Sequence, residues 1–300
     1  MKNHTGIGLM ETSHDKQKNP LETKPIWRLL LEYAIPSIVG LLGSAIYNIT
    51  DQIFIGNIVG IYGNAATNVA FPLVMLVTAF AVLIGLGTAS NFNLLTGSEK
   101  TDAASHFTGN AVSLSVLIGM VIMGLALFFL KPVLLLFCAT ENVLPFALDY
   151  TGIIALGIPF FTFSTAMSYI IRADGKPRFS MIIFLTGAIL NVGLDALFML
   201  VLKRGIEGAA LATTISQIVS ALIALSYLPK FRAVSLKWEC FRIRWEIIKP
   251  IARLGSAYFF FQFVIMFSQV VLNNMLIRYG ALSVYGSDIP LAVVAVVSKS

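Results

Sequence analysis

Four polar side chains in otherwise apolar stretches are the residues of this sequence best suited to chemistry. Asp51 and Asp195 each lie in a long hydrophobic run, Asn191 precedes Asp195 by four residues, and Thr213 lies in the next run. An ionised carboxylate in a low-dielectric setting is costly unless a partner compensates its charge. Carboxylate, amide and hydroxyl oxygens bind hard cations, and two neighbouring carboxylates also share protons. We therefore expect this set to bind Na⁺ or protons, and we expect no other metal site.

The composition places these residues in a membrane. Hydrophobic residues make up 57% of the chain and charged residues 12%, whereas soluble domains carry about 25% charged residues. The apolar runs are long and nearly free of charge, as lipid-exposed helices must be. We predict an all-α integral membrane protein with an eighth span opening at Pro290 and seven complete spans before it: residues 29–55, 65–94, 107–130, 143–171, 179–202, 208–228 and 251–279.

The distribution of basic residues predicts how the chain is oriented. Fifteen Lys and Arg residues fall in the tail of residues 1–28 and in every second loop, against four in the loops between them. This asymmetry predicts a multi-pass protein of the cell membrane with its N-terminus in the cytoplasm. The net charge of +6 is then a topology signal, and we expect no nucleic-acid partner.

One predicted cytoplasmic loop, residues 229–249, is longer than the others. It interleaves basic residues with Trp238, Phe241 and Trp245, a pattern typical of an amphipathic helix lying on anionic lipid. RNA binding through the same residues is a less favoured alternative, because membrane spans flank the loop. We predict that the loop separates a six-helix lobe, residues 29–228, from the start of a second lobe, residues 250–300.

Depth in the membrane groups the four polar residues. Asp195 lies eight residues before Lys203, which puts it on the order of 12 Å below the outer end of its helix. Asn191 stands one turn away on the same face. Thr213 lies early in the returning span, and Asp51 lies toward the outer end of the first span. All four are therefore predicted to share the outer half of the membrane.

Each of these residues also has a purely structural interpretation. Asp51 could be an interfacial carboxylate at a helix end, and Asp195 could make one structural hydrogen bond to a neighbouring helix. Asn191 and Thr213 could be packing residues, since small polar side chains often join membrane helices.

Several segments resemble the multidrug and toxic compound extrusion (MATE) transporters. "NVGLDALFML" and "GIEGAALATTISQ" resemble that family's fifth and sixth helices, and "IIRADGKPRFSM" its loop between helices four and five. "EYAIPSIVG" with "TDQIFIGNIVG" resembles its first helix, and "GLGTASNFNLLTGSEKTDAA" the end of its second. One departure is the uncharged "NLLTG", where the family often carries an arginine shortly before the glycine that matches Gly97.

The resemblance implies a fold and a function. It implies twelve helices in two six-helix lobes around a central cavity, and export of organic, often cationic, compounds in exchange for Na⁺ or H⁺. No cofactor beyond the coupling ion is implied, and we expect the intact two-lobed protein to be a monomer. Since the chain stops at Ser300 within a hydrophobic run, we expect a truncation early in the second lobe. Residues matching Asp51, Asn191, Asp195 and Thr213 form a cation or proton site in some members.

Candidate cavity and hinge residues follow from this interpretation. Aromatic and methionine side chains suit flat organic cations, although for each of them packing or facing lipid is the favoured alternative; the cavity candidates are Tyr33, Tyr47, Phe71, Phe160 and Met167. A proline within a helix removes a backbone hydrogen bond and permits a kink; the hinge candidates are Pro36, Pro72 and Pro159.

Two other classes of function, a flippase and a membrane enzyme, are less favoured by the sequence. A lipid-linked oligosaccharide or polysaccharide flippase of the same superfamily would need a basic cavity, but basic residues occur only at the edges of the spans, as Arg172, Arg253 and Arg278. A membrane enzyme would need catalytic groups at depth, yet the histidines lie in the tail and in a loop, and there is no Walker-type loop. We therefore expect no enzymatic activity.

Overall fold

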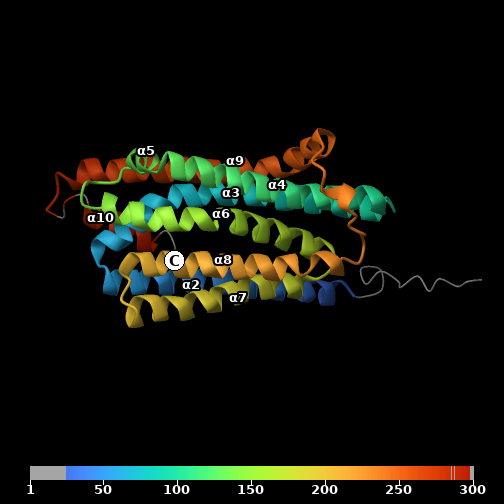
Figure 1. Cartoon of the computed structure of the whole chain (residues 1–300), viewed down its shortest axis with the longest axis horizontal. Helices are drawn as coiled ribbons and strands as arrows, with labels where there is room; N and C mark the ends of the chain where they lie inside the picture. Colours follow the sequence, from blue (N-terminus) through green and yellow to red (C-terminus); the bar gives the residue numbers. More distant parts are fainter. Residues whose placement is uncertain (1–24, 285, 287, 298–300) are drawn as a thin grey trace, which may run out of the picture.

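The computed structural model describes residues 25–284, 286 and 288–297, and every regular element in that part of the chain is a helix (Figure 1). Seven helices are apolar and long enough to cross a membrane, which confirms the seven predicted spans. They are α2 (Ile26–Ile58), α3 (Ile61–Gly97), α4 (Thr101–Phe128), α6 (Leu144–Ala173), α7 (Pro177–Asp195), α8 (Gly205–Leu225) and α9 (Trp245–Gly280). Two shorter helices are α5 (Leu130–Leu136) and α10 (Asp288–Val297). Most of the predicted N-terminal tail, residues 1–24, lies outside the described residues.

The helices reverse direction through short turns whose backbone needs glycine. Gly60 adopts a φ of +85° between α2 and α3, and Gly175 a φ of +80° between α6 and α7. Only glycine enters this left-handed region without a steric cost. Pro177 then begins α7, where its missing N–H leaves no helical bond unmade.

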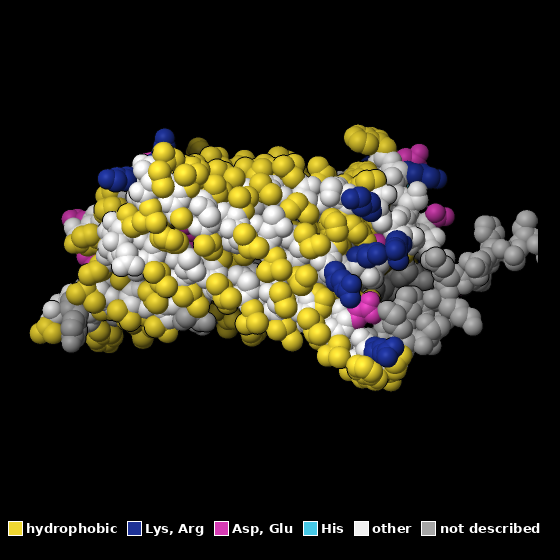
Figure 2. Space-filling model, turned by 90° about the horizontal axis from the view of Figure 1, so that it is seen from below, with side chains coloured by type: hydrophobic (Ala, Val, Ile, Leu, Met, Phe, Trp, Pro, Cys, Tyr) yellow, Lys and Arg dark blue, Asp and Glu magenta, His cyan; other side chains and the backbone are white. Residues whose placement is uncertain are grey.

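The long helices run side by side, with α6 at the centre of the bundle (Figure 1). Helix α6 packs against α3, α4 and α8, while α7 packs against α2 and α8. We call the end of the bundle where α2 begins the linker end, since residues 226–244 (the linker) lie there; the α2–α3 and α7–α8 turns mark the far end. Lys and Arg side chains gather toward the two ends, leaving an uncharged, largely hydrophobic band between them (Figure 2). This is the surface of a multi-pass membrane protein.

The linker is not the amphipathic helix that its aromatic and basic residues predicted. It contains only two short 3-10 segments, Leu228–Lys230 and Trp238–Phe241, and α9 already begins at Trp245, inside the predicted loop. The reason is that side chains of the bundle take its backbone groups. The amide of Asn110 on α4 donates to the carbonyl of Cys240 and accepts from the N–H of Arg244.

Asp174, at the end of α6, fixes the other half of the linker. Its carboxylate accepts hydrogen bonds from the backbone N–H groups of Arg232 and Ala233, both at 3.1 Å, and from the hydroxyl of Tyr227 at 2.8 Å. The linker is thus bound to the bundle at two separate places. These long-range bonds replace the local bonds that a helix would have made.

Helix α9 is joined to α3 at two levels. Gly87 and Gly255 let the backbones touch, since a Cβ on Gly87 would collide with the carbonyl oxygen of Ile251. Nearer the far end, Asn68 donates to Asn273 Oδ1 at 3.0 Å, and Gln269 donates to Asn68 Oδ1 at 3.2 Å. Small residues and amide hydrogen bonds are the usual means of joining helices in membranes. The assignment of α9 and α10 to a second lobe stays a prediction.

Candidate functional site

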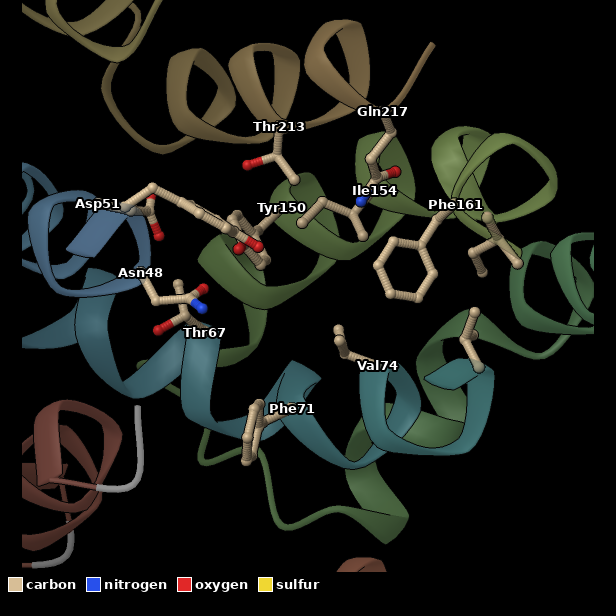
Figure 3. Close-up of a pocket in the computed structure, with 13 residues that line it drawn as sticks. Asn48, Asp51, Thr67, Phe71, Val74, Tyr150, Ile154, Phe161, Thr213 and Gln217 are labelled. Carbon is tan, nitrogen blue, oxygen red and sulfur yellow. The ribbon is translucent and has the colours of Figure 1, made fainter. Parts of the chain in front are cut away.

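A cavity of about 90 Å³ lies toward the far end of the bundle, between α2, α3, α6 and α8 (Figure 3). Asp51 is the one charged side chain among its lining residues. The others are polar, aromatic or aliphatic: Tyr47, Asn48, Thr67, Phe71, Val74, Val77, Tyr150, Ile154, Ile158, Phe161, Thr213 and Gln217.

A second cavity of about 270 Å³ adjoins the first. The two share Tyr47, Phe161, Thr213 and Gln217 in their walls. The second continues along α7 past Asn191 and reaches α9. Together they form one crevice through the interior of the bundle, lined by hydroxyl, amide and aromatic groups.

Asp51 is held in place by a chain of hydrogen bonds between α2 and α3. Its carboxylate is buried and accepts a 3.1 Å bond from Nε2 of the adjacent Gln52. The Oε1 atom of Gln52 in turn accepts a 3.0 Å bond from the hydroxyl of Thr67. These bonds fix the direction of the carboxylate, which lies beside Tyr150 in Figure 3.

The α7–α8 hairpin supplies the other three predicted site residues. Asn191 Nδ2 donates a 3.2 Å hydrogen bond to the hydroxyl of Thr213, so the two residues predicted at one depth are in contact. Asp195, one turn beyond Asn191, is completely buried. Both of its carboxylate oxygens, and the amide oxygen of Asn191, have no hydrogen-bond partner within the described part of the chain.

The backbone next to Asp195 is irregular. Helix α7 ends at Asp195 and continues as a π-helical turn, Ala196–Val201. π-helical turns are rare and often occur at functional sites. The continuous helix predicted for residues 179–202 gave no sign of this turn.

Asp51 and Thr213 line the first cavity, and Asn191 and Thr213 line the second, whereas Asp195 lines neither. A hydrogen bond joins Asn191 to Thr213, and the grouping of Asp51 with Asp195 stays a prediction. Both carboxylates are buried, and a buried carboxylate is stabilised by hydrogen bonds, by a cation or by a proton.

The donor set of this site fits an alkali cation or a proton. It offers carboxylate, amide and hydroxyl oxygens, which suit hard cations. Among the described residues, no group of three or more His, Cys, Asp or Glu side chains comes together.

Sequence reasoning missed several residues of the site. Gln52 is adjacent to Asp51 on α2 and bonds it locally, whereas Thr67 and Tyr150 come near it only because α2, α3 and α6 pack together. Gln217 had a readable signal, because it follows Thr213 by four residues and so lies on the same face of α8. Its carbonyl oxygen is buried and has no partner among the described residues.

The aromatic and methionine candidates divide into two groups. Tyr47 and Phe71 line the cavity, whereas half-buried Tyr33 lies outside both cavities, near Gly175. The cavity predictions for Met167 and Phe160 are corrected: Met167 is fully buried in a hydrophobic cluster, and Phe160 is 38% exposed on the outer face of α6. An all-apolar helix does not reveal from its sequence which face points inward.

The three hinge candidates all lie within helices. Pro36 is inside α2, Pro72 inside α3 and Pro159 inside α6. Each removes one backbone donor from its helix. Their role as hinges stays a prediction.

A family model described as MatE matches residues 36–197, more than half of the chain. The chain belongs to the MATE transporter family. Multidrug export protein MepA of Staphylococcus aureus (strain MRSA252) is 26% identical over 275 residues, which cover 91% of this chain and 61% of that protein. The protein of the same name from Staphylococcus haemolyticus (strain JCSC1435) has the same identity and coverage. The chain thus spans about three fifths of the length of these curated relatives.

Solved MATE structures have the same fold as this chain. The MATE multidrug transporter DinF-BH, determined in complex with R6G, superposes with a TM-score of 0.85 at 33% identity, covering 92% of this chain and 61% of that one. An inward-facing MATE transporter of the MOP superfamily superposes with a TM-score of 0.78 at 24% identity, covering 87% and 60%, and shows the fold alone. The all-α membrane fold and the family resemblance inferred from the sequence are confirmed.

Proposed function

We propose that this MATE protein exports organic, often cationic, compounds by secondary active antiport of Na⁺ or H⁺ with alternating access. The observation that carries the proposal is that two carboxylates, Asp51 and Asp195, are buried within the bundle and that Asp51 lies on the wall of the aromatic crevice. The names of its relatives, a multidrug export protein and a multidrug transporter, support the same function.

The coupling ion is proposed to bind between α2 and the α7–α8 hairpin. Asp51 and both oxygens of Asp195 supply negative charge, and Asn191 Oδ1 and the Thr213 hydroxyl supply neutral oxygens. This set serves a Na⁺ ion as well as it serves a proton. Binding of either ion neutralises a charge that burial otherwise penalises.

The substrate is proposed to be a cation because of what lines the crevice. Tyr47, Phe71 and Phe161 offer aromatic faces to a flat cation, which binds such faces through the ring quadrupole. Asp51 supplies the opposite charge, and no Lys or Arg is found among the residues that the structure places on the two cavities. A phosphate-bearing flippase substrate would need such basic residues, so drug export is the better fit.

Coupling is proposed to arise from competition for the same negative charge. An ion that neutralises the pair weakens the hold on a bound cation, so the two ligands antagonise each other through one site. Helix α2 is suited to respond because it carries Asp51 and contains Pro36. It is also the least enclosed of the seven spans, since only 12% of the residues in its most apolar stretch are buried. We propose that α2 bends when the pair is neutralised and closes the crevice.

The proposed orientation puts the linker end in the cytoplasm. The basic side chains of the linker and of the α6–α7 turn lie at that end. Under the positive-inside rule this end stays on the cytoplasmic side. The ion site, nearer the far end, then lies in the outer half of the membrane.

The test is export of R6G from energised membrane vesicles that contain the protein at its full natural length, with Na⁺ and pH gradients imposed separately. One of the two gradients should drive export in the wild type, and export should be abolished in Asp195→Asn. Asp149→Asn is the matched control, because that carboxylate is exposed at the far end of α6. Undiminished export in Asp195→Asn, with the protein inserted normally, would refute the coupling role. No export under either gradient would turn the assignment toward the flippase.

A further inference from the structure

A second hollow, unrelated to the ion site, lies on the outer surface of the bundle. It has a volume of about 440 Å³ and is lined by α4, α6 and α8. Helix α6 runs between the other two (Figure 1), so it forms the floor, and α4 and α8 form the walls. The lining side chains are all apolar: Val112, Val116, Met120, Met123, Leu156, Pro159, Phe160, Phe163, Ala221, Leu222 and Leu225.

The groove opens onto the surface that faces the bilayer. Met120, Leu156 and Leu222 are between 47% and 57% exposed, and all three side chains are apolar. The groove is therefore continuous with the surface that contacts lipid tails. From Val112 to Met123 it spans eleven residues of α4, about 17 Å, close to the roughly 15 Å hydrocarbon thickness of one leaflet.

Basic charge lies at the linker end of this groove. Ser113, next to Val112 at that end, donates a 2.7 Å hydrogen bond to the carbonyl oxygen of Phe241 in the linker. Arg242 follows directly and is exposed. An apolar channel one leaflet long, whose end lies near the linker segment that carries the exposed Arg242, is complementary to a phospholipid, since arginine binds phosphate well.

We propose that this groove binds a membrane phospholipid, with one acyl chain along the α6 floor and the phosphate at Arg242. Phe160, which the sequence suggested for the drug cavity, is then part of a lipid site instead. Helix α6 separates the two sites, because Ile154, Ile158 and Phe161 line the inner cavity while Pro159 and Phe160 line the groove.

The test uses the purified chain in vesicles of phosphatidylcholine and phosphatidylglycerol with a trace of phosphatidylglycerol that carries a photoactivatable group on its acyl chain. Cross-links are mapped by peptide mass spectrometry. Labels should concentrate on the segments around Met120, Leu156 and Phe160. Even labelling of all lipid-exposed helices would overturn the proposal.

Two groove-filling variants approach from opposite walls, Leu222→Trp on α8 and Met120→Trp on α4. Each should reduce groove labelling roughly tenfold, the effect of losing contact with about two methylene groups. Leu125→Trp, at an exposed position of α4 outside the groove, is the matched control and should label as the wild type does. Unchanged labelling in both groove-filling variants would contradict the proposal.

The headgroup contact is tested by Arg242→Gln against Arg204→Gln, which makes the same charge change at the far end of the bundle. Arg242→Gln should lower groove labelling several-fold, because the phosphate loses its partner, and Arg204→Gln should leave the labelling unchanged. An unchanged result for Arg242→Gln would overturn the placement of the phosphate. The readout is independent of transport, so it does not depend on the proposed function.

Discussion

Asn191 on α7 donates a hydrogen bond of 3.2 Å to the hydroxyl of Thr213 on α8. The amide nitrogen is thereby engaged, and the amide oxygen is left buried on the face of α7 that also carries Asp195. The bond thus sets which atom of the amide is available to a cation.

Replacing Thr213 should therefore weaken ion binding. Thr213→Val removes the hydroxyl oxygen and leaves the Asn191 donor without its partner, which should lower the affinity of the purified protein for its coupling ion roughly tenfold. Thr213→Ser keeps the hydroxyl and should retain most of the affinity. The control is Thr214→Val, since that hydroxyl points to the carbonyl of Ile153 on α6 instead. Equal affinities in Thr213→Val and Thr214→Val would contradict the ligand role.

The crossing of α3 and α9 should tolerate no side chain at Gly87. Gly87→Ala puts a methyl group against the carbonyl of Ile251, and the overpacking should cost about 1–3 kcal/mol of unfolding free energy. Gly124→Ala is the control, because no neighbouring atom lies within 4 Å of its Cβ position; it should be neutral or stabilising by up to about 1 kcal/mol. Thermal unfolding in detergent measures both. A Gly87→Ala protein as stable as Gly124→Ala would show that the helices do not touch there.

The amide cluster between α3 and α9 should show direct energetic coupling. A double-mutant cycle of Asn68→Ala and Asn273→Ala isolates their 3.0 Å hydrogen bond. Hydrogen bonds between membrane helices average about 0.6 kcal/mol in such cycles, with a maximum near 1.7 kcal/mol, and we expect a value in that range. Additive single effects would mean that the two amides do not bond in the membrane.

Asp174→Asn should release the linker from the bundle. An amide accepts at one atom only, so at least one of the bonds from Arg232 N, Ala233 N and Tyr227 is lost, at a local cost of about 1–3 kcal/mol. Amide hydrogen exchange over residues 231–236 should become faster, while exchange in α3 and α6 stays unchanged. The control is again Asp149→Asn. Unchanged exchange over residues 231–236 would refute the anchoring role.

The spans and the contact between Asn191 and Thr213 were predictable from local patterns. Long uncharged runs identify membrane helices, and four-residue spacing with a short hairpin places Asn191, Asp195 and Thr213 together. Asp51 was predicted at a similar depth in the membrane because its position along the first span can be counted from the sequence.

Features that depend on packing between distant segments were not predictable. The linker has an amphipathic pattern, but its backbone bonds to a distant residue instead of forming a helix. Asn110, which lies 130 residues before Cys240, donates a hydrogen bond to the carbonyl of Cys240. Phe160 and Met167 lie on helix faces that their apolar neighbours do not distinguish. Tyr150 and Thr67 reach Asp51 only through contacts between helices.

Ion and substrate are proposed to compete for the negative charge of Asp51 and Asp195. The most direct measurement is the affinity of the purified full-length protein for R6G, by fluorescence anisotropy, as Na⁺ and pH are varied separately. The affinity for R6G should fall as the concentration of either Na⁺ or protons rises. Asp195→Asn should abolish or strongly reduce this dependence, and Asp149→Asn should retain it. An affinity for R6G that depends on neither ion, or the same ion dependence in Asp195→Asn as in the wild type, would contradict competition between ion and substrate.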